Sequence, residues 1–309
     1  MKLLICAVLL VSVALASHPI NKEIVEEIKQ ATKLWTPTDP EENIFRFHHT
    51  ETLVSMLGTK IDHERDMEVG EDMGINDYLE EGENSVPSSF DSRDAWGDIC
   101  PFNIKDQGAC GSCWAFGAIE AFEDRICIQS EGKFTTDLSE QHLVSCDYVG
   151  MGCSGGWPLS AFGYLSLMGV PSEECQPYYS GQTGSAWGCK SKCQDTNDSN
   201  KRYRCKYPWM NFTNKGIKAE IMKNGPVETT MMVYEDFMSY KEGIYHHVAG
   251  KLLGGHAIKL VGWGVEEGVK YWIMANSWSE NWGENGYFRI VEGNSSAGNS
   301  GFSCTPYAY

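Results

Sequence analysis

The chain has 309 residues, enough for one large domain or two modest ones with a proper hydrophobic core. Its formal net charge of −17 argues against nucleic-acid binding, because a polyanion would repel it. Twelve cysteines are many for this length and, together with the amino-terminal signal described next, indicate an oxidising compartment with structural disulfides.

The first 16 residues are typical of a secretory signal peptide. A single basic residue, Lys2, precedes an apolar run over residues 3–13, and Ala-Leu-Ala at 14–16 forms a small-x-small cleavage site. The apolar run is shorter than the roughly 20 residues that a helix needs to span a bilayer. We therefore expect entry into the secretory pathway and no membrane span.

Residues 17–85, called the leader below, are acidic and contain no cysteine. Helical spacing is found for the apolar residues Ile24, Val25, Ile28 and Ala31. Residues 66–84 are dense in Asp and Glu and are expected to form a flexible connector. The leader is either a charged, partly disordered segment or an inhibitory propeptide. Its carboxylates lose charge on acidification, so release of the leader at low pH is a hypothesis.

A cysteine at the start of an apolar helix is the main chemical signal. Residues 107–116 read QGACGSCWAF, and a helix is expected over residues 114–130. Cys113 would face unpaired backbone N–H groups and the positive end of the helix dipole, which favour the nucleophilic thiolate. A histidine nearby would complete an ion pair. The Gln107 side chain and the Cys113 backbone N–H could both donate to an oxyanion.

The spacing Cys110-x-x-Cys113 leaves other interpretations open. It also occurs in redox pairs and in half of a zinc site. No short strand precedes it as in a redox fold, and no second ligand pair has zinc-site spacing. Both cysteines could equally be structural disulfide partners.

The remaining elements change in character along the chain. Further helices are expected over residues 138–144, with Ser139 as N-cap, and over 158–168. Strands are expected at residues 227–233, 256–263, 271–275 and 287–291. Helices first and strands second predict an α+β fold with two lobes. His256, at the start of an apolar strand, would by itself more often be an interior histidine, and Asn276 a turn asparagine.

Four motifs that occur in the same order as in a known family favour functional roles for Cys113, His256 and Asn276. Residues 106–116 resemble the nucleophile region of papain-family cysteine peptidases, whose signature is C-G-[SA]-C-[WY]. The family pattern recurs at residues 153–158 (CSGGWP), 255–257 (GHA) and 276–278 (NSW). From residue 86 to about 292 the chain is most similar to cathepsin B-like members.

The resemblance implies a helical left lobe, a barrel-like right lobe and an active-site cleft between them. Cys113 would be the nucleophile, His256 its ion-pair partner and later the proton donor to the leaving amine, and Asn276 the group that orients His256. Trp278 would shield the Asn–His hydrogen bond from water. Gln107 would complete the oxyanion hole.

Substrate-binding residues follow from the same resemblance. Gly155 and Gly156 would let an extended peptide approach their backbone. Trp157, Pro158 and Ala257 would line the pocket for the residue two before the cleaved bond, which implies an apolar or aromatic preference. Its floor should come from residues 294–304, where no acidic residue can be placed, so acceptance of arginine stays open.

The resemblance also implies disulfides, with Cys6 removed with the signal peptide and Cys113 kept free. The implied pairs are Cys100–Cys127, Cys110–Cys153, Cys146–Cys189 and Cys175–Cys193, and Cys205 and Cys304 remain for each other. Asn197, Asn211 and Asn294 stand in N-x-S/T sequences and are candidate surface glycosylation sites.

Cathepsin B carries, at the position of residues 176–188, a loop whose two histidines hold the substrate's carboxyl terminus. This segment is short here and contains no histidine. We therefore expect a secreted zymogen with a signal peptide (1–16), an inhibitory propeptide (17–85) and an endopeptidase domain (86–309), with little or no dipeptidyl carboxypeptidase activity. The alternatives are an inactive papain-like scaffold protein and a redox protein.

The implied partners are protein or peptide substrates, the leader itself and protein inhibitors of the cystatin type. The protein is expected to be a monomer that needs no metal or cofactor. Its workplace would be a lysosome-like or digestive vacuole, or the outside of the cell.

Overall fold

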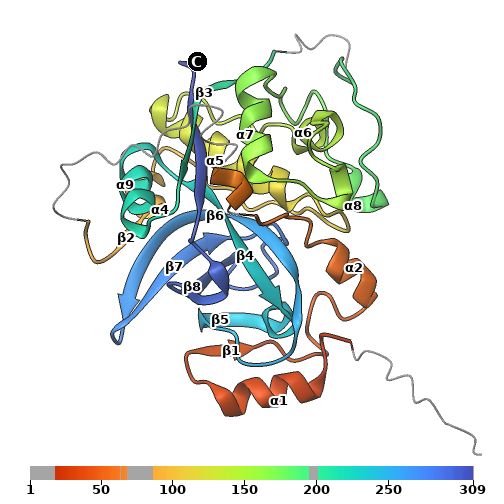
Figure 1. Ribbon diagram of the computed structural model, residues 1–309, viewed down its shortest axis with the longest axis vertical. Helices are drawn as coiled ribbons and strands as arrows, with labels where there is room; N and C mark the ends of the chain where they lie inside the picture. The colour runs from red at the N-terminus through yellow and green to blue at the C-terminus, as the bar shows by residue number, and fades with distance from the viewer. Residues whose placement is uncertain (1–17, 63, 68–85, 195–200, 309) are drawn as a thin grey trace, which may run out of the picture.

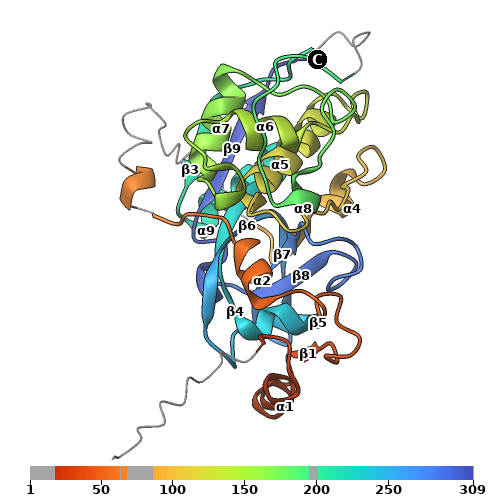
Figure 2. The ribbon, with the colours of Figure 1, turned by 90° about the vertical axis from the view of Figure 1, so that its right-hand side faces the viewer.

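Two lobes make up the protein, a helical one and one built on a sheet. The computed structural model describes residues 18–62, 64–67, 86–194 and 201–308. Figure 1 shows the helices of residues 113–167 together in the upper half, above the strands of residues 227–291. The leader's helix and strand at residues 22–37 lie at the far end of the sheet lobe, while its helix at residues 50–55 lies over the junction of the lobes (Figure 2).

The helical lobe is organised around α5 (Cys113–Gln129), most of whose residues are buried. The other helices of this part of the chain are α4 (Ser92–Trp96), α6 (Glu140–Cys146), η1 (Gly152–Ser154), α7 (Pro158–Leu167) and α8 (Ser180–Thr183). Ser139 caps α6 by accepting a hydrogen bond from the His142 N–H, as predicted. The predicted helices at 114–130, 138–144 and 158–168 all form within two residues of their expected limits.

The sheet lobe contains β3 (Cys205–Asn211), α9 (Asn214–Asn224), β4 (Val227–Tyr234), η2 (Glu235–Ser239), β5 (Tyr240–Tyr245), β6 (Leu252–Glu266), β7 (Val269–Ala275), β8 (Tyr287–Val291), η3 (Asn294–Ser296) and β9 (Gly301–Pro306). The strand order is β1-β5-β8-β7-β6-β4-β9-β3, with β2 (Phe90–Asp91) on β6. The path is open at both ends, so the lobe is a curved sheet rather than a closed barrel.

The four predicted strands lie in β4, β6, β7 and β8, whereas β3, β5 and β9 were not predicted. Proline interrupts β3 and glycine interrupts β5, while β9 begins with glycine and ends with proline. The pairing of β3 also shifts register between Lys206 and Trp209. Strands β3 and β9 also belong to both lobes, because Met210 and Phe302 pack into the hydrophobic core of the helical lobe.

The leader contributes α1 (Lys22–Ala31), β1 (Trp35–Pro37) and α2 (Thr50–Ser55). Three of the four residues with helical spacing, Ile24, Val25 and Ile28, are buried, whereas Ala31 is exposed. Strand β1 extends the sheet by pairing with β5. Of the acidic stretch 66–84, only Asp66 and Met67 lie within the described residues. The described leader thus shares a core with the sheet lobe.

Five disulfides join Cys100–Cys127, Cys110–Cys153, Cys146–Cys189, Cys175–Cys193 and Cys205–Cys304. The first four are the pairs that the resemblance implied, and the fifth joins the two cysteines that were left over by elimination. Cys113 is the one free cysteine of the described residues. Within the same residues, no helix has the length and apolar character of a membrane span.

Asn211 cannot serve as a surface glycosylation site in this fold. Its side chain is buried, and its Oδ1 accepts hydrogen bonds from the Thr213 N–H and hydroxyl. The Asn294 Oδ1 accepts from the His247 N–H, and Asn294 is half-buried. Asn197 lies outside the described residues.

Candidate active site

Cys113 is the first residue of α5 and is fully buried beneath the leader. Its Sγ is hydrogen-bonded to the hydroxyl of Thr59, 3.0 Å away. Burial raises the pKa of the Cys113 thiol, although the Thr59 hydroxyl and the backbone groups of Ala257 and Gly58 act in the opposite direction. With the leader in place, the thiol is therefore held in its neutral form.

His256 comes from β6 and is also fully buried. Its Nε2 lies 2.7 Å from Oδ1 of Asn276, which follows β7, and its ring centre is 4.8 Å from that of Trp278. Burial lowers the pKa of His256 to about 4, partly offset by the hydrogen bond to Asn276. The other ring nitrogen, Nδ1, has no hydrogen-bond partner among the described groups.

The structure thus brings His256, Asn276 and Trp278 together and places Cys113 at the adjoining face of α5. The contact between the lobes runs through Ala257, whose backbone interacts with the Cys113 sulfur. Cys113 and His256 thus come from opposite lobes, and the residue that follows His256 contacts the Cys113 sulfur, so a thiolate–imidazolium pair could form across this junction.

Gln107 points its amide into the same site. Its Nε2 donates to the backbone oxygens of Met56 and Cys110, both at 2.8 Å, and its Oε1 accepts from the Ser277 hydroxyl at 2.8 Å. The Ser277 contact fixes which end of the amide faces the cleft. The donor expected to stabilise an oxyanion is thus occupied by a leader carbonyl, that of Met56.

The leader crosses the cleft as an extended strand. Lys60 N–H donates to the Gly156 oxygen at 2.9 Å, Gly156 N–H donates to the Gly58 oxygen at 2.9 Å, and Thr59 N–H donates to the Gly255 oxygen at 3.1 Å. A Cβ on Gly155 would lie 2.0 Å from the Gly58 oxygen. The glycines are therefore needed for the close backbone approach that their lack of side chains predicts.

The other residues expected to bind substrate lie beside this strand. Pro158 and Ala257 are buried, and the half-buried ring of Trp157 lies under the guanidinium of Arg65 at 4.1 Å. Thr230, opposite Ala257 in β4, lies with its Oγ1 3.2 Å from the Ser300 Oγ. The stretch 294–304 thus places a hydroxyl beside Ala257, and the sequence of that stretch contains no carboxylate.

Sequence reasoning missed three contributors to this site. Met56 and Thr59 of the leader carry no motif, and only their position in the fold brings them to Gln107 and Cys113. Glu228 is an acidic residue inside an apolar strand, and this contrast could have identified it as a candidate site residue. In the structure neither of its carboxyl oxygens has a hydrogen-bond partner, and the residue is fully buried against Gly117 of α5.

The disulfide Cys110–Cys153 excludes the redox interpretation, because Cys110 is not available to exchange with Cys113. It also removes Cys110 as a zinc ligand. Among the described residues, no cluster of three or more His, Cys, Asp or Glu side chains has the arrangement of a metal site.

Comparison with known proteins agrees with this geometry. The family model described as papain family cysteine protease matches residues 86–306. The chain belongs to the papain family of cysteine proteases. It is 41% identical to cathepsin B-like cysteine proteinase 4 of Caenorhabditis elegans over 246 residues, covering 70% of this chain and 73% of the relative. It is 36% identical to the gut-specific cysteine proteinase of the same organism, over 96% of each chain.

Solved structures extend the likeness to the leader. Procathepsin B S9 from Trypanosoma congolense superposes with a TM-score of 0.84 at 30% identity, covering 94% of this chain and all of that one. The digestive procathepsin L 3 of Tenebrio molitor superposes with a TM-score of 0.70 at 25% identity, covering 92% of this chain and 86% of that one. The protein is thus a cathepsin B-like cysteine peptidase with a papain-like fold.

Glu228 provides a test of the electrostatics beneath the nucleophile. Burial and the nearby acidic groups Cys113, Glu120 and Asp66 hold the pKa of the Glu228 carboxyl well above its ordinary value of 4.5. Because the folded-state pKa exceeds the unfolded one, this residue's contribution to stability is present below pH 4.5 and is lost as pH rises toward the folded pKa. We expect Glu228→Gln to reduce the fall in Tm between pH 5 and pH 8 by about 3 °C or more.

The matched control is Glu280→Gln, an exposed position with the same change in charge. It should reproduce the wild-type pH dependence of Tm. Parallel curves for Glu228→Gln and Glu280→Gln would show that Glu228 does not ionise in this range.

Proposed function

We propose that this peptidase is a cysteine endopeptidase made as a secreted zymogen, with residues 17–85 as its inhibitory propeptide and residues 86–309 as its catalytic domain. One observation carries the proposal. The leader's Met56 carbonyl occupies the Gln107 donor, and its Thr59 hydroxyl occupies the Cys113 sulfur. A segment that fills the oxyanion donor and covers the nucleophile prevents a substrate carbonyl from reaching either group.

Once the leader is displaced, the same groups support acyl transfer. The Cys113 thiolate attacks the peptide carbonyl carbon, and the oxyanion that forms accepts hydrogen bonds from the Gln107 Nε2–H and the Cys113 backbone N–H. The C–N bond breaks as imidazolium His256 gives its proton to the leaving amine. Neutral His256 then takes a proton from water, the hydroxide attacks the thioester, and the carboxylic product leaves with Cys113 restored as thiolate.

Asn276 and Trp278 act on the orientation of His256. The 2.7 Å contact between the Asn276 Oδ1 and the His256 Nε2 leaves Nδ1 for the cysteine. This role requires no carboxylate, because the charge that stabilises the imidazolium is the thiolate itself. The side chain of Trp278 is buried against the ring, which keeps water from the hydrogen bond.

The proposed workplace is a lysosome-like or digestive compartment, or the outside of the cell. A signal-like amino terminus and five disulfides support an oxidising route. Two similar proteins are named for the gut or for digestion, which supports the digestive choice. The preferred substrates are unfolded or extended protein segments, because the cleft binds backbone at Gly156.

Thiol alkylation tests the activated nucleophile. We expect acid-treated protein to react with iodoacetamide at the single site Cys113, at least about tenfold faster than untreated protein, because removing the leader exposes the thiol to His256. Peptide hydrolysis should disappear in step with labelling, and Cys113→Ala should show neither. If Cys113 in the acid-treated protein reacts no faster than a free thiol, the inactive scaffold becomes the better reading.

The short segment between Cys175 and Cys193 leads to a second test, on the mode of cleavage. Residues 176–188 contain no histidine to hold a substrate's terminal carboxylate. We expect internal cleavage of peptides blocked at both ends, at a rate about equal to that for peptides with a free carboxyl terminus. Mass spectrometry showing efficient, sequential loss of carboxy-terminal dipeptides from a peptide blocked only at its amino terminus would contradict endopeptidase specificity.

Asp66 gives a third test, on how the leader responds to pH. Burial raises the pKa of its carboxyl to about 6, with Asp62 adding to the shift and Arg65 opposing it. Because the docked pKa exceeds the free value near 3.8, docking by Asp66 is strongest at low pH and weakens as pH rises through about 6. This pH dependence is opposite to the hypothesis that acidification releases the leader. Release at low pH would therefore have to come from other groups.

We expect Asp66→Asn, which cannot ionise, to hold the leader more tightly than wild type at pH 7 and about equally at pH 4. The alkylation rate of Cys113 in unprocessed protein reports leader opening and should fall by about tenfold at pH 7 in this variant. Glu51→Gln, an exposed leader position, is the control and should match wild type. An unchanged rate in Asp66→Asn at pH 7 would mean that Asp66 does not govern docking.

A further inference from the structure

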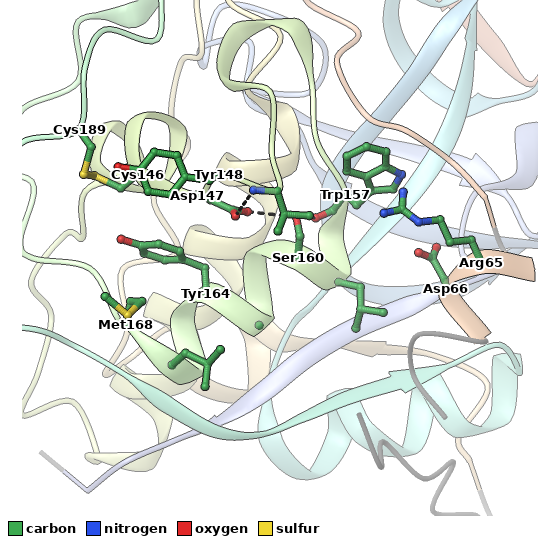
Figure 3. Close-up of a pocket in the computed structure, with 14 residues that line it drawn as sticks. Arg65, Asp66, Cys146, Asp147, Tyr148, Trp157, Ser160, Tyr164, Met168 and Cys189 are labelled. Carbon is green, nitrogen blue, oxygen red and sulfur yellow. Dashed lines mark hydrogen bonds between the residues drawn. A yellow bond between two sulfur atoms is a disulfide. The ribbon is translucent and has the colours of Figure 1, made fainter. Parts of the chain in front are cut away.

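A second hollow lies on the helical lobe, beyond the cleft. It runs along α7 and has a volume of about 580 Å³. We call it the α7 groove, and Figure 3 shows the side chains around it. The apolar residues that line it are Tyr148, Val149, Trp157, Leu159, Leu167 and Met168.

Four of these six side chains are exposed to an unusual degree for their type. Tyr148 is 87% exposed, Leu167 73%, Met168 61% and Val149 57%. Helix α7 is apolar on two sides, because its Leu159, Phe162 and Leu165 are buried in the lobe while Leu167 faces outward. A contiguous exposed apolar surface is costly in water and marks a binding site.

The polar groups of the α7 groove are already used by the protein itself. The carboxylate of Asp147 accepts from the Val149 N–H at 3.0 Å and from the Ser160 hydroxyl at 3.1 Å (Figure 3). The Tyr164 hydroxyl is hydrogen-bonded to His142, 3.0 Å away. A ligand in the groove would therefore gain chiefly from burial of apolar surface rather than from hydrogen bonds.

The leader shows that the α7 groove continues the cleft. After Thr59 at Cys113 and Lys60 at Gly156, the leader reaches Trp157, where Arg65 lies over the ring, and then places Asp66 at the groove wall. Arg65 and Asp66 are the charged lining residues that depart when the leader is removed. A single polypeptide path thus connects the nucleophile with the groove.

We propose that, in the activated enzyme, the α7 groove binds an aliphatic or aromatic stretch of the protein substrate on the amino-terminal side of the cleaved bond. The inference rests on the proposed function, in which Gly156 and Trp157 contact the residue two before that bond. Chain that continues past Trp157 then belongs to earlier residues of the substrate. The volume of the groove is within the range of pockets that bury several apolar side chains. Substrates with such a stretch would be cleaved preferentially.

Three substrates with the same residues around the cleaved bond test this. One is a short blocked peptide that begins two residues before the bond, one carries an upstream Leu/Phe-rich extension, and one carries a Ser/Gly extension of equal length. Wild-type enzyme, activated from the full chain, should have the highest kcat/KM for the apolar extension. Leu167→Glu and Met168→Glu should lower that value by about tenfold through KM, because the variant loses the apolar burial and places a carboxylate against the apolar stretch of the substrate.

The short peptide should be cleaved equally by wild type and both variants. Val265→Glu, which changes a 44% exposed apolar residue on β6 in the same way, is the matched control and should leave all three substrates unaffected. Equal losses for the short and the extended substrates, or equal effects of Leu167→Glu and Val265→Glu, would overturn the proposal. So would wild-type dimerisation that Leu167→Glu abolishes, since the occupant would then be a second copy.

Binding separates this inference from the proposed activity. A fluorescent peptide carrying the Leu/Phe-rich stretch should bind to enzyme alkylated at Cys113, with anisotropy reporting an affinity about tenfold weaker in Leu167→Glu. That difference would support the groove even if hydrolysis were absent, in which case the proposed function alone would have failed. Equal affinity in wild type and Leu167→Glu would overturn the groove proposal while leaving peptidase activity intact.

Discussion

The packing of α5 against β6 determines the geometry of the active site. Cys113 begins α5, and His256 lies on β6, so the relative position of these two proposed reacting groups depends on how the two elements pack. Lys259, three residues after His256, fixes the contact by reaching Asp124 at 2.8 Å and Glu120 at 3.7 Å on α5. All three side chains are buried, so loss of the lysine would leave carboxylates unpaired in the interior.

This arrangement makes the region under the nucleophile sensitive to protons. Burial raises the pKa of Glu120 to about 8, despite Lys259 and Lys105. Within the part of the chain that the structure describes, the Glu228 carboxyl has no hydrogen-bond partner, because its cross-strand neighbour Lys259 pairs with Asp124 and Glu120. Lys259 lies beside more carboxyls than one ammonium group can neutralise. The remaining carboxyls are most easily accommodated when they are protonated.

The sequence was sufficient where function depends on short local patterns. Cys113 follows a glycine-rich turn at a helix start, and the periodicity of the following residues predicted α5 almost to its ends. The resemblance supplied roles for His256 and Asn276, which no periodicity could have connected to Cys113, because their proximity depends on how two lobes pack.

Other features depend on long-range packing and were not predicted. Strands β3 and β9 are joined by pairing and by the Cys205–Cys304 disulfide rather than by alternating sequence. The contacts of Met56 and Thr59 with the catalytic groups follow from the path of the leader, and the α7 groove combines residues from α7, from residues 146–149 and from the leader. Asn211 shows the reverse error, since a local glycosylation pattern falls on a side chain that the fold buries.

The leader and a substrate would use the same surface with different chemistry. An inhibitory segment must bind weakly enough to leave when the enzyme is activated. The leader places two charged residues, Arg65 and Asp66, beside the apolar walls of the α7 groove, where charged side chains bind weakly. Burial of the Asp66 carboxyl, together with the nearby Asp62, raises its pKa and makes docking of the leader depend on protonation. An apolar substrate segment would bury the exposed faces of Leu167 and Met168 without that cost. In the proposed function, the leader would block catalysis through its backbone contacts at Gly156 and Gly255, and the most favourable burial in the α7 groove would be left to the substrate.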